Sequence, residues 1–283
     1  MQINTVKNVF PAVRDDIADL QTWRALPTRH VETIDPFLFL NHHGRQVYAP
    51  RNRGLPFGPH PHRGFETVTF ILEGDIAHRD SGGHESIIDA GGIQWMTAGS
   101  GLVHSETSSD DFKMRGGPME ILQLWVNLPG RLKFCPPNYV GLQAGQIPVI
   151  ESDGGRVSVQ LISGAWDGQH GPIEPLLDIA AMTIRIQAGG SLATSIATGR
   201  NIFFNVVRGT VEVNGRTVGQ RHLVEFDGSG EGLQVAATAD ALILLCHAEP
   251  IGEPVVSHGP FVMNTHAEIR QAILDYQAGK FGA

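Results

Sequence analysis

Residues 58–66 read GPHPHRGFE, and residues 97–106 read TAGSGLVHSE. Side chains two residues apart in a strand point to the same face, so His60 pairs with His62 and His104 pairs with Glu106. Turns rich in glycine or proline border both pairs, and the segment between them has the character of short strands. An antiparallel sheet could bring the two pairs face to face. Three imidazoles and one carboxylate suit a divalent first-row metal.

The composition favours a β protein that does not grip nucleic acid. With 283 residues the chain is long enough for one large all-β domain or two domains of ordinary size. Its 34 glycines and 17 prolines predict many turns, short strands and few helices. The formal net charge is −8 and no run is rich in Lys or Arg, so we expect no direct contact with nucleic acid.

The two cysteines, Cys135 and Cys246, cannot build a disulfide framework, which predicts a reducing compartment. The first residues lack the apolar core and cleavage site of a signal peptide. No apolar run approaches the roughly 20 residues of a membrane span. We therefore expect a soluble, cytoplasmic protein without membrane partners.

Strand signals recur along the first half. Residues 67–72 are β-branched and aromatic, and the turn signal Glu-Gly-Asp at 73–75 closes them. Further glycine-rich turns at 80–83 and 89–92 precede a strand at 93–97. Strands spaced by about 8 to 12 residues predict a β-sandwich or barrel rather than alternating strands and helices.

The second half repeats this pattern without the histidines. Residues 202–209 resemble the strand that ends at Gly74, and residues 218–226 resemble residues 89–96. Between them, Asn214-Gly215 predicts a hairpin with a type I′ turn. The segment that corresponds to His60 and His62 reads Leu-Ala-Thr-Ser-Ile at 192–196. We interpret the chain as an internal duplication in which the second copy lacks metal ligands.

Chain-breaking residues from Cys135 to about Pro148 predict a connection between two domains, residues 1–135 with the metal site and residues 136–283 without it. The second domain is expected to include a C-terminal helix. The helix signals are a capping box, an apolar stripe and a terminal glycine, formed by Thr265, Glu268, Ile269, Ala272, Ile273, Tyr276 and Gly279.

Two carboxylates compete for the fourth ligand position. Glu106 accompanies His104, whereas Glu66 shares the parity of His60 and His62, although Gly64 could interrupt strict alternation. Other histidines and the tryptophans are interpreted as non-ligands: His42 and His43 as surface or supporting residues, His78 and His84 as solvated, and Trp95 and Trp125 as core aromatics.

Four segments carry a resemblance to a known family: HPHRGFETVT at 60–69, QWMTAG at 94–99 followed by His104 and Glu106, QLWVNLP at 123–129, and HGPFVMNT at 258–265. On these residues nearly the whole chain is similar to the pirin family of the cupin superfamily. The resemblance implies an all-β bicupin, with two β-barrel (jelly-roll) domains, a short C-terminal helix, and a metal only in the N-terminal domain.

The resemblance also implies the ligand set. Pirins take their fourth ligand from the glutamate two residues after the last histidine, which selects Glu106 beside His60, His62 and His104. Cupins at large would select Glu66, which then becomes a residue that supports the ligands. The implied cofactor is one divalent metal ion, Fe(II) first, with Mn, Ni, Co, Cu or Zn as alternatives.

Several pirins are similar to quercetin 2,3-dioxygenases, which open the central ring of a flavonol with O2 and release carbon monoxide. The resemblance therefore implies a flavonoid-like substrate, with Glu106 as the base that takes the proton of the 3-hydroxyl. The alternative that the same family offers is a metal-dependent regulatory protein, a redox-responsive co-regulator or a modulator of a metabolic enzyme, which binds a protein partner without significant turnover.

Overall fold

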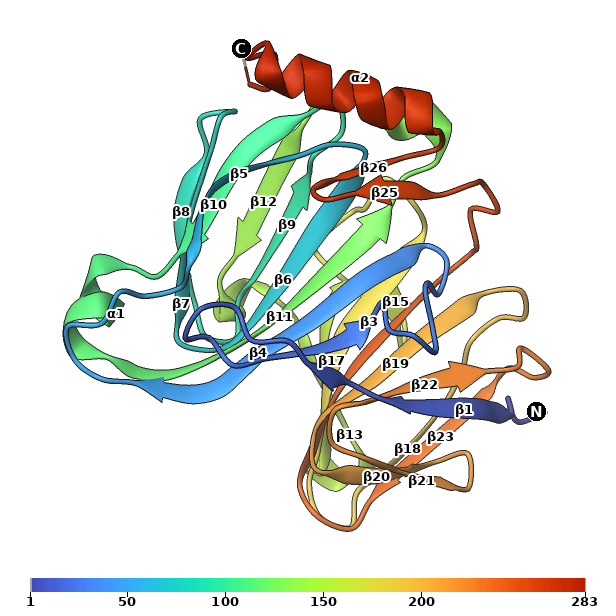
Figure 1. The fold of residues 1–283 in the computed structure, drawn as a ribbon. Helices are drawn as coiled ribbons and strands as arrows, with labels where there is room; N and C mark the ends of the chain where they lie inside the picture. Colours follow the sequence, from blue (N-terminus) through green and yellow to red (C-terminus); the bar gives the residue numbers. More distant parts are fainter. Residues whose placement is uncertain (1, 283) are drawn as a thin grey trace. The chain divides into compact units, whose positions relative to one another are not determined.

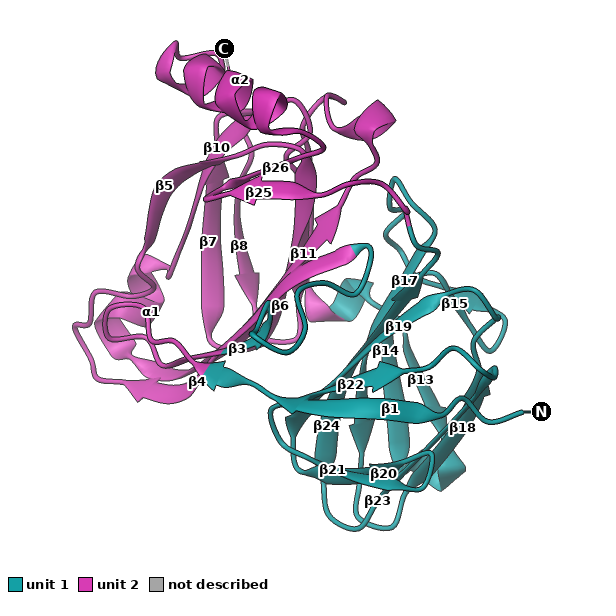
Figure 2. Ribbon diagram, turned by 45° about the vertical axis from the view of Figure 1, so that its right-hand side comes forward, with its two compact units in different colours: residues 1–13, 24–36, 145–250 teal, residues 14–23, 37–144, 251–283 magenta. Residues whose placement is uncertain are grey.

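The structure is a computed structural model that describes residues 2–282. Antiparallel strands dominate the described chain, together with two α-helices (Figure 1). The elements form two compact units (Figure 2). Unit 1 comprises Met1–Val13, Arg24–Pro36 and Gly145–Pro250, and unit 2 comprises Arg14–Trp23, Phe37–Ala144 and Ile251–Ala283.

Unit 2 is built from two sheets. The larger has the order β12-β9-β6-β11-β4 and continues into β3 and β2, which share residues with unit 1. Its strands are β12 (Asn138–Leu142), β9 (Ile93–Thr97), β6 (Phe65–Glu73), β11 (Gly117–Asn127), β4 (Phe37–Tyr48), β3 (Thr22–Leu26) and β2 (Val13–Arg14). The smaller sheet has the order β5 (Phe57–His62), β10 (Leu102–Thr107), β7 (Asp75–Asp80) and β8 (Glu85–Asp89). The hairpin of β25 (Val256–His258) and β26 (Phe261–Met263) and the helices α1 (Asp110–Arg115) and α2 (His266–Gln277) complete the unit.

Unit 1 repeats this plan. Its larger sheet has the order β1 (Val6–Pro11), β22 (His222–Phe226), β19 (Asn201–Arg208), β24 (Ala241–Ala248), β17 (Ile179–Ile186), β14 (Val157–Ser163) and β13 (Val149–Ser152). Its smaller sheet has the order β18 (Ser191–Ser195), β23 (Gly232–Ala237), β20 (Thr210–Val213) and β21 (Arg216–Gly219). A short hairpin pairs β15 (Ala165–Trp166) with β16 (Gln169–His170). The predicted all-β, duplicated architecture is confirmed.

Short 3-10 helices lie at Gly130–Leu132 (η1), Ala144–Gln146 (η2) and Asp153–Gly155 (η3).

The predicted hairpin in the second half is also confirmed. Val213 pairs with Arg216 across the turn between β20 and β21, and Asn214 and Gly215 adopt φ angles of 45° and 77°. Positive φ angles at both central positions are what a type I′ turn requires.

Helix α2 begins and ends where the sequence predicts. The Thr265 hydroxyl accepts a hydrogen bond from the Glu268 backbone N–H and caps the helix, and Gly279, with φ 71°, follows its end. Ile269 and Ala272 are buried and pack in a cluster with Phe261, Met263 and Phe281. The helix thus belongs to unit 2. The sequence-based division into residues 1–135 and 136–283 groups it with the second domain instead, and that division stays a prediction.

Helix α1 was not predicted, because among its six residues only Phe112 is buried, so it shows no apolar stripe.

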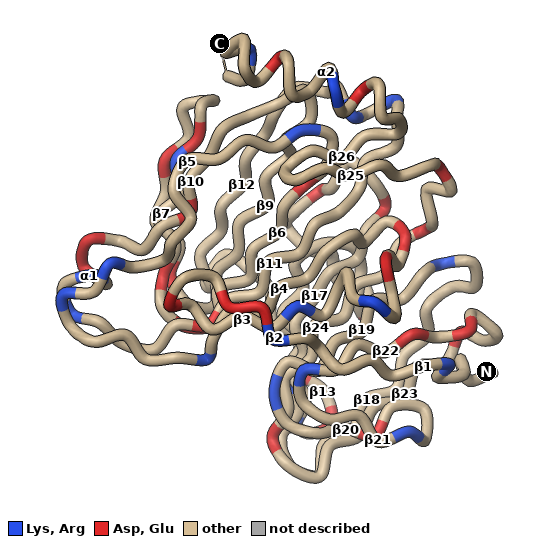
Figure 3. Tube along the Cα trace, viewed as in Figure 1, with Lys and Arg blue, Asp and Glu red and all other residues tan. Residues whose placement is uncertain are grey.

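Charged residues of both signs are interspersed along the described trace (Figure 3). None of the helices within residues 2–282 is long and apolar enough to cross a membrane.

A buried lysine donates hydrogen bonds to three segments of unit 2. Lys133 is 1% exposed, and its Nζ donates to the carbonyl of Gly64 at 2.8 Å, the side chain of Asn127 at 2.7 Å and the carbonyl of Val262 at 3.1 Å. Burial lowers the pKa of Lys133 to about 8. Gly64 follows β5 with φ 87°, and a Cβ atom there would collide with the Val262 carbonyl. The lysine therefore holds the turn after β5 against β11 and β26.

Lys133→Met is expected to lower the free energy of unfolding by about 2 to 4 kcal/mol, because it leaves three buried acceptors without their donor. Denaturant unfolding measures the change. Lys113→Met is the matched control, since Lys113 pairs with an Asp110 side chain that is 99% exposed, and we expect a change below about 0.5 kcal/mol. Equal effects of the two substitutions would contradict the fastening role.

Candidate metal centre

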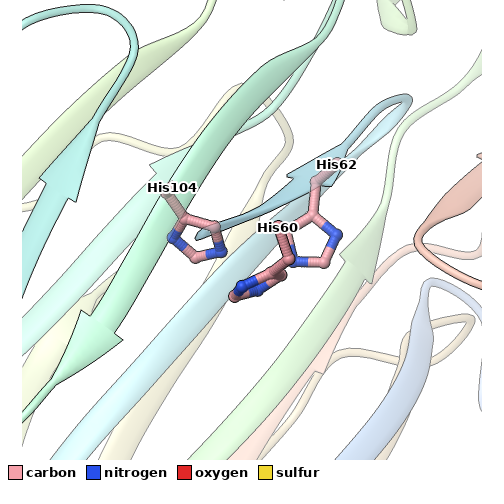
Figure 4. A group of neighbouring side chains, drawn as sticks. All are labelled: His60, His62 and His104. Atoms are coloured by element: carbon pink, nitrogen blue, oxygen red, sulfur yellow. The ribbon is translucent and has the colours of Figure 1, made fainter. Parts of the chain in front are cut away.

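Strands β5 and β10 bring the three histidines together. They pair antiparallel, with His104 opposite His60 and Leu102 opposite His62. The imidazole ring centroids lie 4.4 Å apart for His60 and His104, 4.8 Å for His60 and His62, and 5.0 Å for His62 and His104. Figure 4 shows the three rings clustered together. Among the described residues this is the only group of three or more potential ligands whose donor atoms all lie within 4.8 Å of one another.

Backbone carbonyls contact Nδ1 in two of these rings. His60 Nδ1 lies 2.7 Å from the Gly58 carbonyl and His62 Nδ1 lies 3.2 Å from the Pro260 carbonyl. A carbonyl can only accept, so each Nδ1 carries a hydrogen, and in the neutral form of the ring the lone pair then lies on Nε2. Burial, reinforced by His60, lowers the pKa of His62 to about 3, so its ring is neutral at physiological pH. Neutral imidazoles are the form that binds metal.

His104 provides the test of whether a metal fits. It is 2% exposed, and neither of its ring nitrogens has a hydrogen-bond partner within residues 2–282. Burial lowers its pKa well below the ordinary value, with the neighbouring histidines adding to the effect. A buried polar atom without a partner is costly, and an ion bound at about 2.0 to 2.1 Å would supply one. The residues therefore fit a divalent metal.

Glu106 lies beside the cluster and is held by donors from the larger sheet. It is 1% exposed, and its Oε2 lies 4.0 Å from His104 Nε2. Its Oε1 accepts from Thr69 Oγ1 at 2.9 Å and from Gln94 Nε2, and its Oε2 accepts from Gln123 Nε2 at 2.6 Å. These three donors fix the orientation of the carboxylate beside His104.

Glu66 faces the other side of its strand. On β6, Thr69 contacts Glu106 and pairs with Gln94 of β9. The side chains of β6 with the same alternation as Thr69 therefore face the site. Glu66 lies three residues from Thr69, has the opposite parity, and accepts from Thr97 Oγ1 at 2.7 Å. The interruption at Gly64 that the sequence left open is present: the chain turns there with φ 87°, and the parity that Glu66 shares with His60 and His62 does not carry into β6.

Three other histidines of unit 2 make buried hydrogen bonds. His42 Nε2 contacts Glu120 Oε1 at 2.7 Å, and His43 Nδ1 contacts Thr22 Oγ1 at 2.8 Å. The interpretation of His78 as solvated is wrong: its side chain is fully buried, and its Nε2 lies 3.0 Å from Asp80 Oδ2. His84, whose side chain is 45% exposed, fits the prediction.

Several residues near the site escaped the sequence analysis, namely Thr69, Gln94, Gln123 and Tyr139. The available signal was that polar residues interrupt strands which are otherwise apolar. Such residues must find partners when they are buried.

An aromatic surface adjoins His62. Trp125 is partly exposed, and its ring centroid lies 5.3 Å from that of His62, 4.5 Å from that of Phe65 and 4.6 Å from that of Phe39, on which it stacks. Trp95, by contrast, is 4% exposed and belongs to the core, as predicted. Trp125 is thus more than a core residue, because it lies next to a candidate ligand.

Comparisons with known proteins match most of the chain to one family. The sequence model of the pirin family matches residues 19–126, and that of the pirin C-terminal cupin domain matches residues 181–282. A pirin-like protein of Caulobacter vibrioides is 43% identical, with 94% of each chain covered. A Pseudomonas aeruginosa protein, provisionally named a quercetin 2,3-dioxygenase, is 37% identical, with 88% of this chain and 87% of that protein covered. A crystal structure of quercetin 2,3-dioxygenase from Acinetobacter baumannii superposes with a TM-score of 0.94 at 31% identity, covering 100% of this chain and 99% of that one.

The buried position of Glu66 predicts a pH effect on stability. Burial raises its pKa to about 7 from an ordinary value of 4.5, so the folded state holds this proton more tightly than the unfolded state. The resulting stability is fully present below about pH 4.5 and is lost as pH rises through about 7. In metal-free protein, the wild type should lose on the order of 3 kcal/mol relative to Glu66→Gln over this range. Denaturant unfolding at a series of pH values checks this, and parallel curves for the two proteins would contradict it.

Proposed function

Because the chain belongs to the pirin family, we propose that it is a metal-dependent dioxygenase that cleaves a flavonol such as quercetin with O2 and releases carbon monoxide. The observation that carries the proposal is the convergence of three imidazoles beside a buried carboxylate. The high structural similarity to a quercetin 2,3-dioxygenase supports the choice of reaction.

His60, His62, His104 and Glu106 would hold the ion, with Fe(II) as the proposed metal. The hydrogen bonds of His60 to Gly58 and of His62 to Pro260 orient two of the rings. A divalent ion held there supplies a Lewis acid that favours the ionised flavonol and conducts electron density to O2.

The chain itself supplies a base and an aromatic surface. Glu106 Oε2 accepts one hydrogen bond, from Gln123, and keeps lone-pair capacity to receive the proton of the flavonol 3-hydroxyl. Trp125, which is partly exposed beside His62, is the aromatic side chain on which we expect a planar substrate to pack. In the balanced reaction, carbon 3 loses its bonds to carbons 2 and 4 and leaves as carbon monoxide. Both atoms of O2 enter the ring-opened ester, so no external reductant is needed.

Removal of a proposed ligand should abolish turnover. After anaerobic reconstitution with Fe(II), we expect wild-type protein to consume quercetin under O2 with release of carbon monoxide. His62→Ala and Glu106→Gln should lower the rate at least 100-fold, because each removes a donor to the metal and the second also removes the base. Loss of quercetin absorbance and detection of carbon monoxide measure the reaction.

Glu66→Gln is the matched control, since Glu66 is a buried glutamate of the same unit that faces away from the histidines. Its rate should stay within about threefold of wild type, in line with the small effects of substitutions away from functional features. If Glu66→Gln loses most of the rate while Glu106→Gln stays active, Glu66 and not Glu106 is the ligand and the base. Stoichiometric metal binding without turnover would contradict quercetin as the substrate and would favour a metal-dependent regulatory role.

A further inference from the structure

A chain of hydrogen bonds runs behind Glu106 through three strands. Gln94 of β9 donates from Nε2 to Glu106 Oε1, and the Tyr139 hydroxyl of β12 donates to Gln94 Oε1 at 3.2 Å. Ser86 Oγ of β8 lies 2.6 Å from the same hydroxyl. None of these three residues is a proposed ligand. Gln94 contacts Glu106 directly, and Tyr139 also stacks on His78, whose ring centroid lies 5.5 Å from that of His104.

The donor and the acceptor of each hydrogen bond in this series can be assigned. A tyrosine hydroxyl has one hydrogen, and here it is given to Gln94, so Ser86 must be the donor to Tyr139. The amide oxygen of Gln94 faces Tyr139, which turns its NH2 group toward Glu106. The reverse orientation of the amide would set its oxygen against the carboxylate oxygen, two acceptors without a hydrogen between them. Tyr139 therefore selects the amide orientation that Glu106 needs.

Tyr139 is itself held in place. Its ring stacks on that of His78, with centroids 4.0 Å apart and an interplanar angle of 13°. The pairing of β12 with β9 sets Tyr139 opposite Met96, so Gln94 lies two residues along β9 on the same face. The hydroxyl thus reaches the amide diagonally across the two strands, and its position does not depend on a mobile loop.

We propose that Tyr139 and Gln94 are positioning residues that hold the Glu106 carboxylate toward His104 and thereby set the metal affinity of the site. The inference rests on the proposed function, since it takes Glu106 as a ligand. Partners behind a ligand typically change metal affinity by about 10- to 100-fold when they are removed. The expected effect therefore falls on binding and on the geometry around the metal, not on folding.

The test is a titration of metal-free protein with Co²⁺, whose visible spectrum reports the ligands and their geometry. Tyr139→Phe should bind Co²⁺ about tenfold more weakly and shift the visible bands, with unchanged thermal unfolding of the metal-free protein. Tyr48→Phe is the matched control, because Tyr48 is a buried tyrosine of the same unit whose hydroxyl has no hydrogen-bond partner among the described residues. It should bind Co²⁺ like wild type.

A double-mutant cycle tests whether Tyr139 acts through Gln94. Gln94→Leu should weaken Co²⁺ binding, and in that background Tyr139→Phe should have no further effect. Independent, additive losses would overturn the inference, because Tyr139 would then act by another route. If Gln94→Leu does not fold, Gln94→Met serves the same cycle with an unbranched side chain of similar length.

Glu106→Gln separates failure of the inference from failure of the proposed ligand set. If this variant binds Co²⁺ weakly with altered bands while Tyr139→Phe matches wild type, the inference is overturned and the ligand set stands. If Glu106→Gln binds Co²⁺ with the wild-type affinity and spectrum, Glu106 is no ligand, and the inference falls with it.

Discussion

The candidate site of unit 2 depends on the partners that its buried ionisable groups find. His62, His104 and Glu106 are each at most 3% exposed, in an environment where a polar group without a partner is costly. Backbone carbonyls satisfy Nδ1 of two histidines, and Thr69, Gln94 and Gln123 satisfy Glu106. Both ring nitrogens of His104 lack a hydrogen-bond partner in the described chain, and a bound cation would supply a partner to one of them.

The end of the chain takes part in this arrangement although it is distant in sequence. The carbonyl of Pro260 fixes the tautomer of His62 across 198 residues, and the backbone of Val262 donates to the carbonyl of Arg63. Arg63 in turn donates to Asp275 of α2 at 2.8 Å and lies 4.5 Å from the centroid of the Phe281 ring. The last residues are therefore part of the environment of the site, which explains why they group with unit 2.

The sequence predicted the features that depend on local spacing. The His-x-His and His-x-Glu pairs, the Asn-Gly turn and the capped helix each follow from periodicity or turn chemistry over a few residues. The face of Glu66 could not be predicted, because it depends on how the backbone resumes after Gly64. Tyr139 and Gln94 are 45 residues apart in sequence and meet only through the register of β12 with β9. Such long-range pairs leave no signature in the spacing of one segment.

The comparison of the two copies separates the fold from the site. In unit 1, Leu192 of β18 pairs with Val235 of β23, and both lie in a cluster of apolar side chains that includes Val213 and Leu233. That interior needs no hydrogen-bond partners, and the same two-sheet plan is stable there through apolar burial. The plan therefore does not require the histidines. In unit 2, threonine and glutamine side chains donate to Glu106, and a tyrosine donates to one of these glutamines. The polar lining around Glu106 thus distinguishes unit 2 from unit 1, whose interior keeps the same two-sheet plan with leucine and valine side chains.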